Sequence, residues 1–291
     1  RVLSGAFGEV PNTWNTANDT HYNKELSLYF EIFENLHTGT KYYITENGSG
    51  RMDGSDWNNA LAGLPSKFSR GHTYYIAGGE YPGLLLLNKE SNGQKITLKK
   101  ATAEECGDIA GWKQEFEDQQ IIQYYNGTYG VPNVVISVET DDWIIDGGER
   151  DSWHEGYGWK IIYSDVYAPE GLVIISGDDN IIRGIEFEHS REGRDELPRV
   201  SIMTSGLNNT IEYCLSKYQT KFVSTSYDNG DHTLIQYNMI KDGTHLISHP
   251  NTIDIQFSDY CIVRYNWFQN VYSGPCQHNM KEYYHCTSIG N

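Results

Sequence analysis

The sequence lacks several features that mark common functional classes. Its basic residues are few, with 22 Lys and Arg against 39 Asp and Glu, which gives a formal net charge of −17. Such a chain has no basic footprint for nucleic acid, so we expect no nucleic-acid partner. The run of leucines at 84–87 is far too short to cross a bilayer, and we expect no membrane span.

The cysteines do not form a zinc motif. They are Cys106, Cys214, Cys261, Cys276 and Cys286, and no two of them stand in a C-x-x-C pair. Cys214 and Cys261 lie within apolar strand patterns, so we expect small buried residues rather than bridge partners. Cys276 and Cys286 are close in sequence and are the better candidates for a disulfide.

Alanine and leucine are sparse, whereas the chain has 22 tyrosines and 29 glycines. This composition favours strands and turns over helices. A length of 291 residues suffices for a large core within one β-rich domain. The chain begins RVLSGAFG, without an initiator methionine or a signal peptide, as expected of a processed or trimmed chain.

One strand pattern recurs four times in the second half of the chain. It appears as GDDNIIRGIEFEHS from Gly177, LNNTIEYCLSKY from Leu207, GDHTLIQYNMIKD from Gly230 and SDYCIVRYNWFQN from Ser258. The core positions align as Ile182, Ile211, Ile235 and Val263, at intervals of 29, 24 and 28 residues. A loose period of this size is typical of a solenoid in which each repeat is one coil.

A second strand precedes each repeat, with the sequences GLVIIS, RVSIMTS, FVSTSY and TIDIQF. Alternation predicts that one set of residues points inward: Val173 and Ile175, Val200 and Ile202, Val223 and Thr225, and Ile253 and Ile255. No helical segment between the strands is long enough for a crossover, so each coil winds directly onto the next. The prediction is an all-β fold, a right-handed parallel β-helix (solenoid) with an N-terminal cap.

Stacked coils place equivalent residues above one another, about 4.8 Å apart. We therefore expect an aromatic column of Tyr213, Tyr237 and Tyr265, and an amide ladder between Asn238 and Asn266. The outward positions of the second strand are predicted to be Ile174, Ser176, Ser201, Met203, Ser224, Ser226, Asp254 and Gln256. Asp254 is the one charged residue in that set.

The N-terminal half contains KYYITENGSGRMDGSDWNNALAGL and RGHTYYIAGGEYPGLLLL, which resemble the opening of many secreted parallel β-helix proteins. The matching residues are Tyr42, Tyr43, Asn47, Gly48, Ser49, Asp53, Gly54, Trp57, Thr73, Tyr75, Ile76, Ala77, Gly78, Gly79 and Tyr81. The resemblance covers roughly residues 40–290. That family includes pectate-lyase-like and alginate-lyase-like enzymes, glycoside hydrolases and surface proteins, so the resemblance implies a fold more than an activity.

The predicted β-helix occupies residues 41–291, and residues 1–40 do not fit the coil pattern. Within them, KELSLYFEIFENL fits either a helix or a strand, and we favour a cap on the N-terminal end. WNNALAGL, residues 57–64, is expected to form a short amphipathic turn that closes the open end of the core.

Catalysis by a β-helix enzyme needs charged groups on the outward side of one sheet. A lyase needs a base and a cation beside the substrate carboxylate, and a hydrolase needs two facing carboxylates. Asp254, His245 and His249 are the candidate catalytic residues, because a histidine near a carboxylate can form an acid–base pair. The alternative is that both histidines lie in a surface loop.

An acidic, tryptophan-rich stretch is a second candidate site, for calcium or for carbohydrate. It contains Asp141, Asp142, Asp146, Glu149, Asp151, Trp153 and Trp159. Carboxylates bind Ca²⁺, which is the one cofactor that these residues suggest, and flat aromatic rings suit sugar faces. The alternative is an acidic loop with structural aromatic residues.

Four Asn-x-Ser/Thr triplets are glycosylation candidates, at Asn18, Asn47, Asn126 and Asn208. Together with the candidate disulfide they favour a secreted or cell-surface location. Two functions fit this sequence. One is a carbohydrate-active protein, a lyase or hydrolase with a polysaccharide or glycan partner. The other is a non-catalytic structural or adhesive protein that self-associates end to end, as a filament or fibre subunit.

Overall fold

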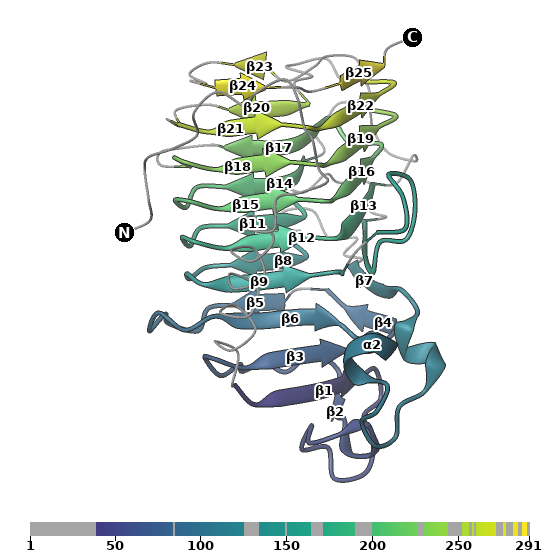
Figure 1. The fold of residues 1–291 in the computed structure, drawn as a ribbon. Helices are drawn as coiled ribbons and strands as arrows, with labels where there is room; N and C mark the ends of the chain where they lie inside the picture. The colour runs from purple at the N-terminus through teal and green to yellow at the C-terminus, as the bar shows by residue number, and fades with distance from the viewer. Residues whose placement is uncertain are drawn as a thin grey trace, which may run out of the picture. The chain divides into compact units, whose positions relative to one another are not determined.

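A computed structural model gives the structure of residues 39–83, 85–124, 134–148, 150–163, 171–189, 200–225, 230–243, 252–255, 258, 260–271, 276–277, 282–284 and 287–289. The strands of these residues form three parallel sheets of ten, eight and seven strands, named A, B and C below (Figure 1). Residues 1–38 lie outside the described part of the chain, so the predicted N-terminal cap stays a prediction.

Sheet A consists of β2 (Leu61–Ala62), β1 (Lys41–Thr45), β3 (Thr73–Ile76), β6 (Ile96–Lys100), β9 (Trp143–Asp146), β12 (Ile181–Arg183), β15 (Thr210–Glu212), β18 (Leu234–Gln236), β21 (Ile262–Arg264) and β24 (Glu282–Tyr284). Sheet B consists of β4 (Gly79–Pro82), β7 (Gln120–Tyr124), β10 (Trp159–Tyr163), β13 (Ile185–His189), β16 (Leu215–Lys217), β19 (Met239–Lys241), β22 (Trp267–Gln269) and β25 (Thr287–Ile289). Sheet C consists of β5 (Leu85–Leu87), β8 (Ile136–Val138), β11 (Val173–Ile175), β14 (Val200–Thr204), β17 (Lys221–Thr225), β20 (Ile253–Ile255) and β23 (Cys276–Gln277).

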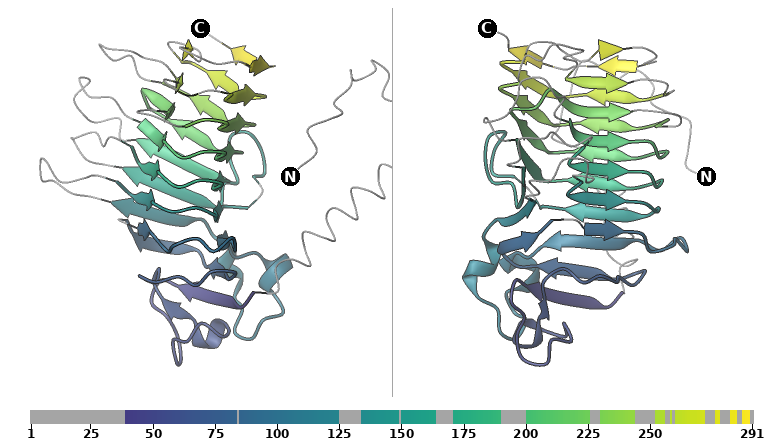
Figure 2. Two further views of the ribbon diagram at one scale, coloured as in Figure 1. Left: turned by 90° about the vertical axis from the view of Figure 1, so that its left-hand side faces the viewer. Right: turned by 180° about the vertical axis from the view of Figure 1, so that it is seen from behind.

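The chain passes through sheets A, B and C in turn and then returns to sheet A one coil further on. Thus β9, β10 and β11 are followed by β12, β13 and β14, and each of these pairs in parallel with the strand three positions earlier. Figures 1 and 2 show the coils stacked from β1 to β25. The predicted right-handed parallel β-helix is confirmed.

The strands of sheet B were not predicted as a third element of each coil. They follow directly after the tyrosine column, where the sequence pattern indicated only a turn and a loop. Leu215 and Met239 point away from the core yet are fully buried, because another loop covers them. When residues on both sides of a strand are buried, apolar and polar residues no longer alternate along it, and the sequence pattern that predicts a strand is lost.

The core residues of sheets A and C lie where the pattern placed them, except for Val200, which is buried but lies outside the main core cluster and is in register with Lys221. Ile182, Ile211, Ile235 and Val263 are fully buried and in register across four coils. The outward assignment of Ser201 is wrong, because Ser201 is fully buried and its Oγ lies 2.7 Å from the Oγ of Ser216 in sheet B. The second residues of β14 and β17, Ser201 and Phe222, point into the core at the corner between sheets B and C, whereas the first residue of β17, Lys221, lies on the outer face.

The predicted amide ladder is confirmed between sheets A and B. The Asn266 side-chain oxygen accepts hydrogen bonds from the backbone N–H and the side-chain amide of Asn238, at 2.9 and 3.0 Å. Asn238 in turn accepts from the N–H of Cys214, which takes the same place one coil earlier. Cys214 and Cys261 are fully buried and neither is part of a disulfide, as expected. Burial raises the pKa of Cys214 to about 12, so it stays a neutral packing residue.

The predicted tyrosine column is also confirmed. The rings of Tyr213, Tyr237 and Tyr265 stack at centroid distances of 5.1 Å, with interplanar angles of 5° and 10°. All three have φ between 53° and 54°, a left-handed conformation that L-residues seldom adopt. Gly184 takes this place in the preceding coil, where a Cβ would lie 2.5 Å from the Gly148 carbonyl oxygen. Stacking of the rings offsets part of the backbone strain.

The N-terminal end carries a second, smaller hydrophobic cluster outside sheet A. The short helices η1 (Trp57–Asn59), α2 (Ala103–Cys106) and η2 (Gln114–Glu117) contribute Trp57, Cys106 and Phe116, which cover Tyr43 and Tyr75. The prediction for residues 57–64 is therefore only partly right. Leu61 and Leu64 pack against the main core, but Trp57 covers the outer face of sheet A.

None of the helices in the described residues is both long and apolar enough to cross a membrane.

Replacing Asn266 by Ala tests the amide ladder. The change leaves the Asn238 amide and N–H without their acceptor inside the core, and we expect a loss of about 2–3 kcal/mol in the free energy of unfolding. Urea unfolding measures it. The matched control is Asn92→Ala, which removes an exposed amide that donates to Gln94 and should cost less than about 0.5 kcal/mol. Equal effects of the two changes would show that the ladder adds nothing.

Candidate functional site

The outer face of sheet C carries an ion pair between Lys221 of β17 and Asp254 of β20. The Lys221 ammonium donates to Asp254 Oδ2, and the Asp254 side chain has no exposed surface. The register pairs Asp254 with Ser224, so Lys221 reaches it from three residues earlier on the neighbouring strand. Desolvating a carboxylate costs several kcal/mol unless a partner offsets it, so Lys221 helps to keep Asp254 buried here.

The remainder of this face is neutral in the described strands. From β5 to β17, the residues in register with Asp254 are Leu86, Ser137, Ile174, Met203 and Ser224. Lys221 is thus a cation that the sequence pattern did not assign to this face. The predicted catalytic residues His245 and His249 lie outside the described residues, so the structure does not place them beside Asp254.

A cavity of about 560 Å³ opens on the same face at its N-terminal end. Its lining consists of Ser66, Lys67, Phe68, Ser69, Leu86, Asn88, Lys89 and Glu90. Leu86 belongs to β5 and points outward, with 46% of its surface exposed, whereas Phe68 is buried. The cavity and the ion pair therefore share the outer face of sheet C, five strand spacings or about 24 Å apart.

The acidic residues of the second candidate site do not converge. The Asp141 side chain accepts from the N–H of Asp178 at 2.8 Å, and the Asp142 carboxylate accepts from the Ser91 hydroxyl at 2.5 Å. Both lie at the corner between sheets C and A. Asp146 lies on the outer face of sheet A, where it is buried and pairs with Arg183 at 2.7 Å.

The loop after Asp146 folds over the outside of sheet B as a clasp, defined here as residues 150–158. Trp153 and Tyr157 of this clasp pack on Leu215 and Met239. In Figure 1 the teal loop between β9 and β10 rises beside β13 and β16. A loop from one coil thereby covers apolar side chains of two later coils.

Arg150 anchors the clasp to the tyrosine column. Its guanidinium lies 3.8 Å from the ring centre of Trp153 and 5.4 Å from that of Tyr213, and it donates to the carbonyl of Tyr237 at 2.9 Å. Trp153 also meets the ring of Trp267 at 5.7 Å. The faces of Trp153 are therefore used in contacts within the protein.

The other predicted residues of this stretch lie apart from one another. Trp159 is fully buried in the core, Asp151 is exposed, and Glu149 lies outside the described residues. No three His, Cys, Asp or Glu side chains in the described ranges come close enough together to hold a metal ion. The described members of the predicted calcium set lie apart from one another, and calcium binding stays a prediction.

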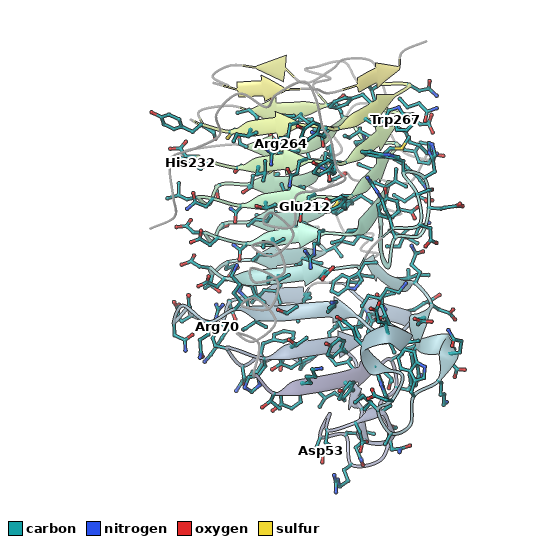
Figure 3. The ribbon with its side chains drawn as sticks, viewed as in Figure 1. Asp53, Arg70, Glu212, His232, Arg264 and Trp267 are labelled. Carbon is teal, nitrogen blue, oxygen red and sulfur yellow. The ribbon has the colours of Figure 1, made fainter. Side chains whose placement is uncertain are left out.

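Charged side chains on sheet A form a ladder along the coils. Asp146 pairs with Arg183, the Glu212 carboxylate accepts from Gln236 at 2.7 Å, and Gln236 accepts from Arg264 at 2.8 Å. Figure 3 shows Glu212 and Arg264 on this face of sheet A. Each of these charges meets a partner on a neighbouring strand, which is the arrangement expected of a structural surface.

Sheet B carries a tighter cluster of Lys160, Glu186, Glu188 and Lys217 from three successive strands. Lys217 lies 2.5 Å from Glu186, and Lys160 lies 2.8 Å from Glu188 and 3.4 Å from Glu186. Burial alone would raise the pKa of Glu186, but hydrogen bonds and charge from Lys217 and Lys160 hold it below its ordinary value. Both lysines are engaged in ion pairs with these two carboxylates.

Replacing Glu186 by Gln tests this cluster through its pH dependence. A carboxyl with a lowered folded pKa stabilises the protein fully above its unfolded value of 4.5 and loses that contribution as pH falls through the folded value. We expect the variant to lose about 1–2 kcal/mol near neutral pH and to approach the unchanged protein below about pH 4. Urea unfolding across that range measures it, with Glu115→Gln in an exposed pair as control. A loss that is the same at every pH would contradict the ionic origin.

Comparisons with known proteins supply no family for this chain. No protein-family model matches it, and no curated protein matches it. Among solved structures, the chain is similar to one described as "Crystal structure of pectate lyase Pel9A". The identity is 11%, the match covers 86% of this chain and 76% of that chain, and the TM-score is 0.49. The fold described above rests on the strand pairing within this chain.

Proposed function

We propose that the protein is a carbohydrate-active β-helix protein that acts on a polysaccharide along the outer face of sheet C. The observation that carries this proposal is the Lys221–Asp254 pair. On sheets A and B charges form ladders or clusters over several strands, whereas the described residues in register with Asp254 on sheet C are neutral. A buried charge pair on an otherwise neutral face is a functional-site candidate.

The groups present favour elimination over hydrolysis. Hydrolysis of a glycosidic bond uses two facing carboxylates, and Asp254 is the one carboxylate among the described outward residues of β17 and β20. Elimination needs a base for the proton beside a sugar carboxylate and a cation to stabilise the negative charge that develops. Lys221 is suited to be that cation, and Asp254 is the residue that positions it.

His245 and His249 are the proposed base, since they stand in the segment before β20 and a neutral imidazole accepts a proton near neutral pH. In this step the base takes the proton next to the sugar carboxylate. The electron pair of that C–H bond forms a C=C bond, the glycosidic C–O bond breaks, and the leaving oxygen takes up a proton from water.

Activity assays on a panel of polysaccharides test the proposal, with ultraviolet absorbance reporting the unsaturated product. We expect Lys221→Met to lower kcat about 100-fold or more, the effect typical of losing one stabilising group at a developing anion. Asp254→Asn should lower kcat with a smaller change in KM, because it misplaces Lys221. Lys241→Met on sheet B is the matched control and should retain activity.

The same panel, run with added calcium and with chelator, includes reducing-end assays for hydrolysis. If both Lys221→Met and Asp254→Asn still cleave the substrate, these two residues take no part in the reaction. If no polysaccharide of the panel is cleaved or bound, the carbohydrate function itself is wrong.

A non-catalytic scaffold is the second candidate function, and the paired charges on sheets A and B favour it. Such a protein would self-associate end to end, since stacked coils expose strand edges to which another copy can add. Electron microscopy of negatively stained protein and sedimentation over a range of concentrations test this. Filaments together with an inactive polysaccharide panel would support the scaffold, whereas a monomer at all concentrations would contradict it.

An extracellular location is part of the proposal. The side chains of Asn47 and Asn208 are exposed, which glycosylation at these triplets requires. Asn18 and Asn126 lie outside the described residues, as does the side chain of each cysteine in the candidate Cys276–Cys286 disulfide.

A further inference from the structure

We infer that the cavity at β5 is an anion-binding subsite, which takes a carboxylate or sulfate group carried by a sugar unit. This inference rests on the proposed function for the polymeric nature of the ligand. Direct binding of small anions tests the site by itself. Three features of the molecule support it: the charges of the lining, the way the loop is held, and the place of the cavity on sheet C.

The lining has a surplus of positive charge although the protein is strongly acidic. It contains Lys67 and Lys89 against the single carboxylate of Glu90, while the whole chain has a net charge of −17. Neither lysine forms an ion pair within the described ranges. By contrast, Lys99 and Lys217 lie 2.6 and 2.5 Å from their glutamate partners. Two such ammonium groups at one cavity favour an anionic ligand.

Arg70 holds the loop that carries Lys89. Its guanidinium donates to the carbonyl oxygens of Lys89 and Glu90 from one side, and to that of Asp141 at 2.7 Å from the other. Figure 3 shows Arg70 beside the loops at this end of the coil. Arg70 is almost fully buried. A loop fixed in this way loses little conformational entropy on binding, which favours affinity.

The rest of the lining suits a sugar ring next to the anionic group. Ser66, Ser69 and Asn88 supply hydroxyl and amide groups that can pair with sugar hydroxyls. Leu86 supplies an exposed apolar surface of the kind that packs against the C–H face of a ring. An inorganic anion alone would use the lysines and leave these groups unused.

The position of the cavity indicates a ligand with repeated charges. It lies about 24 Å from the Lys221–Asp254 pair along one face of sheet C. A single sugar cannot contact both places, whereas an extended chain with an anionic group on successive units can. The substrate class assigned by this geometry is a polyanionic polysaccharide that spans at least five coils.

Titration calorimetry with glucuronate, inorganic sulfate and glucose tests the site directly. We expect glucuronate to bind more tightly than sulfate and glucose not to bind. The double variant Lys67→Met/Lys89→Met should weaken glucuronate binding about tenfold, as for the loss of two partly exposed charge contacts. Lys95→Met/Lys113→Met is the matched control and should bind normally. Binding should also weaken as salt is raised.

Each other result overturns the inference. Equal binding of glucose and glucuronate would make the cavity a neutral sugar site, and sulfate alone would make it an adventitious anion site. Binding unchanged in the double variant would place the anion elsewhere. Absence of binding by all three probes would remove the site.

Chain length separates this inference from the proposed function. The double variant at the cavity should raise KM for long polyanionic chains and leave KM for short oligosaccharides unchanged, with kcat the same. Lys221→Met should instead lower kcat for both lengths and leave glucuronate binding intact. If the cavity binds anions but the protein has no activity on any polysaccharide, the anion-binding subsite stands and the proposed function is wrong.

Discussion

The parallel register between coils is the constraint on which this structure depends. Backbone hydrogen bonds run from each strand to the strand three positions on, so each residue meets its counterpart one coil away. A residue type that pairs well with itself is therefore stabilised in every coil. The tyrosine column shows the strength of this effect, because three residues accept a left-handed backbone in order to stack. The backbone preference of each single tyrosine is thus overridden by a stacking contact that recurs from coil to coil.

The same register determines how outward charges behave. Like charges one above the other would repel at about 5 Å, and along sheet A this is avoided because the sign of the charge alternates from coil to coil. Asp146, Arg183 and Glu212 are an example on sheet A. A charged cluster on a β-helix is thus the ordinary result of stacking. Proximity of charges alone does not identify a catalytic site here, and a buried pair on a face whose described strands are otherwise neutral is the more informative observation.

Sequence patterns were sufficient for sheets A and C, where Ile182 or Val173 alternate with outward residues over the repeats. They failed for sheet B, because Leu215 and Met239 are buried from outside by a clasp that begins at residue 150, 65 and 89 residues earlier in the chain. Lys221 was missed for a related reason. It meets Asp254 diagonally, three residues out of register, and no rule of alternation connects the two. Contacts made by loops across coils depend on three-dimensional placement that local periodicity does not contain.

The three faces consequently differ in what they can bind. Sheet B is covered by the clasp over Leu215 and Met239, and the N-terminal strands of sheet A are covered by Trp57 and Phe116. Sheet C retains an exposed Leu86 and a lysine-lined cavity at one end, and a buried ion pair toward the other. A long ligand gains from several weak contacts on one rigid wall, since each coil keeps its place without any ordering cost on binding. That combination is the reason for assigning the proposed extended, charged ligand to sheet C.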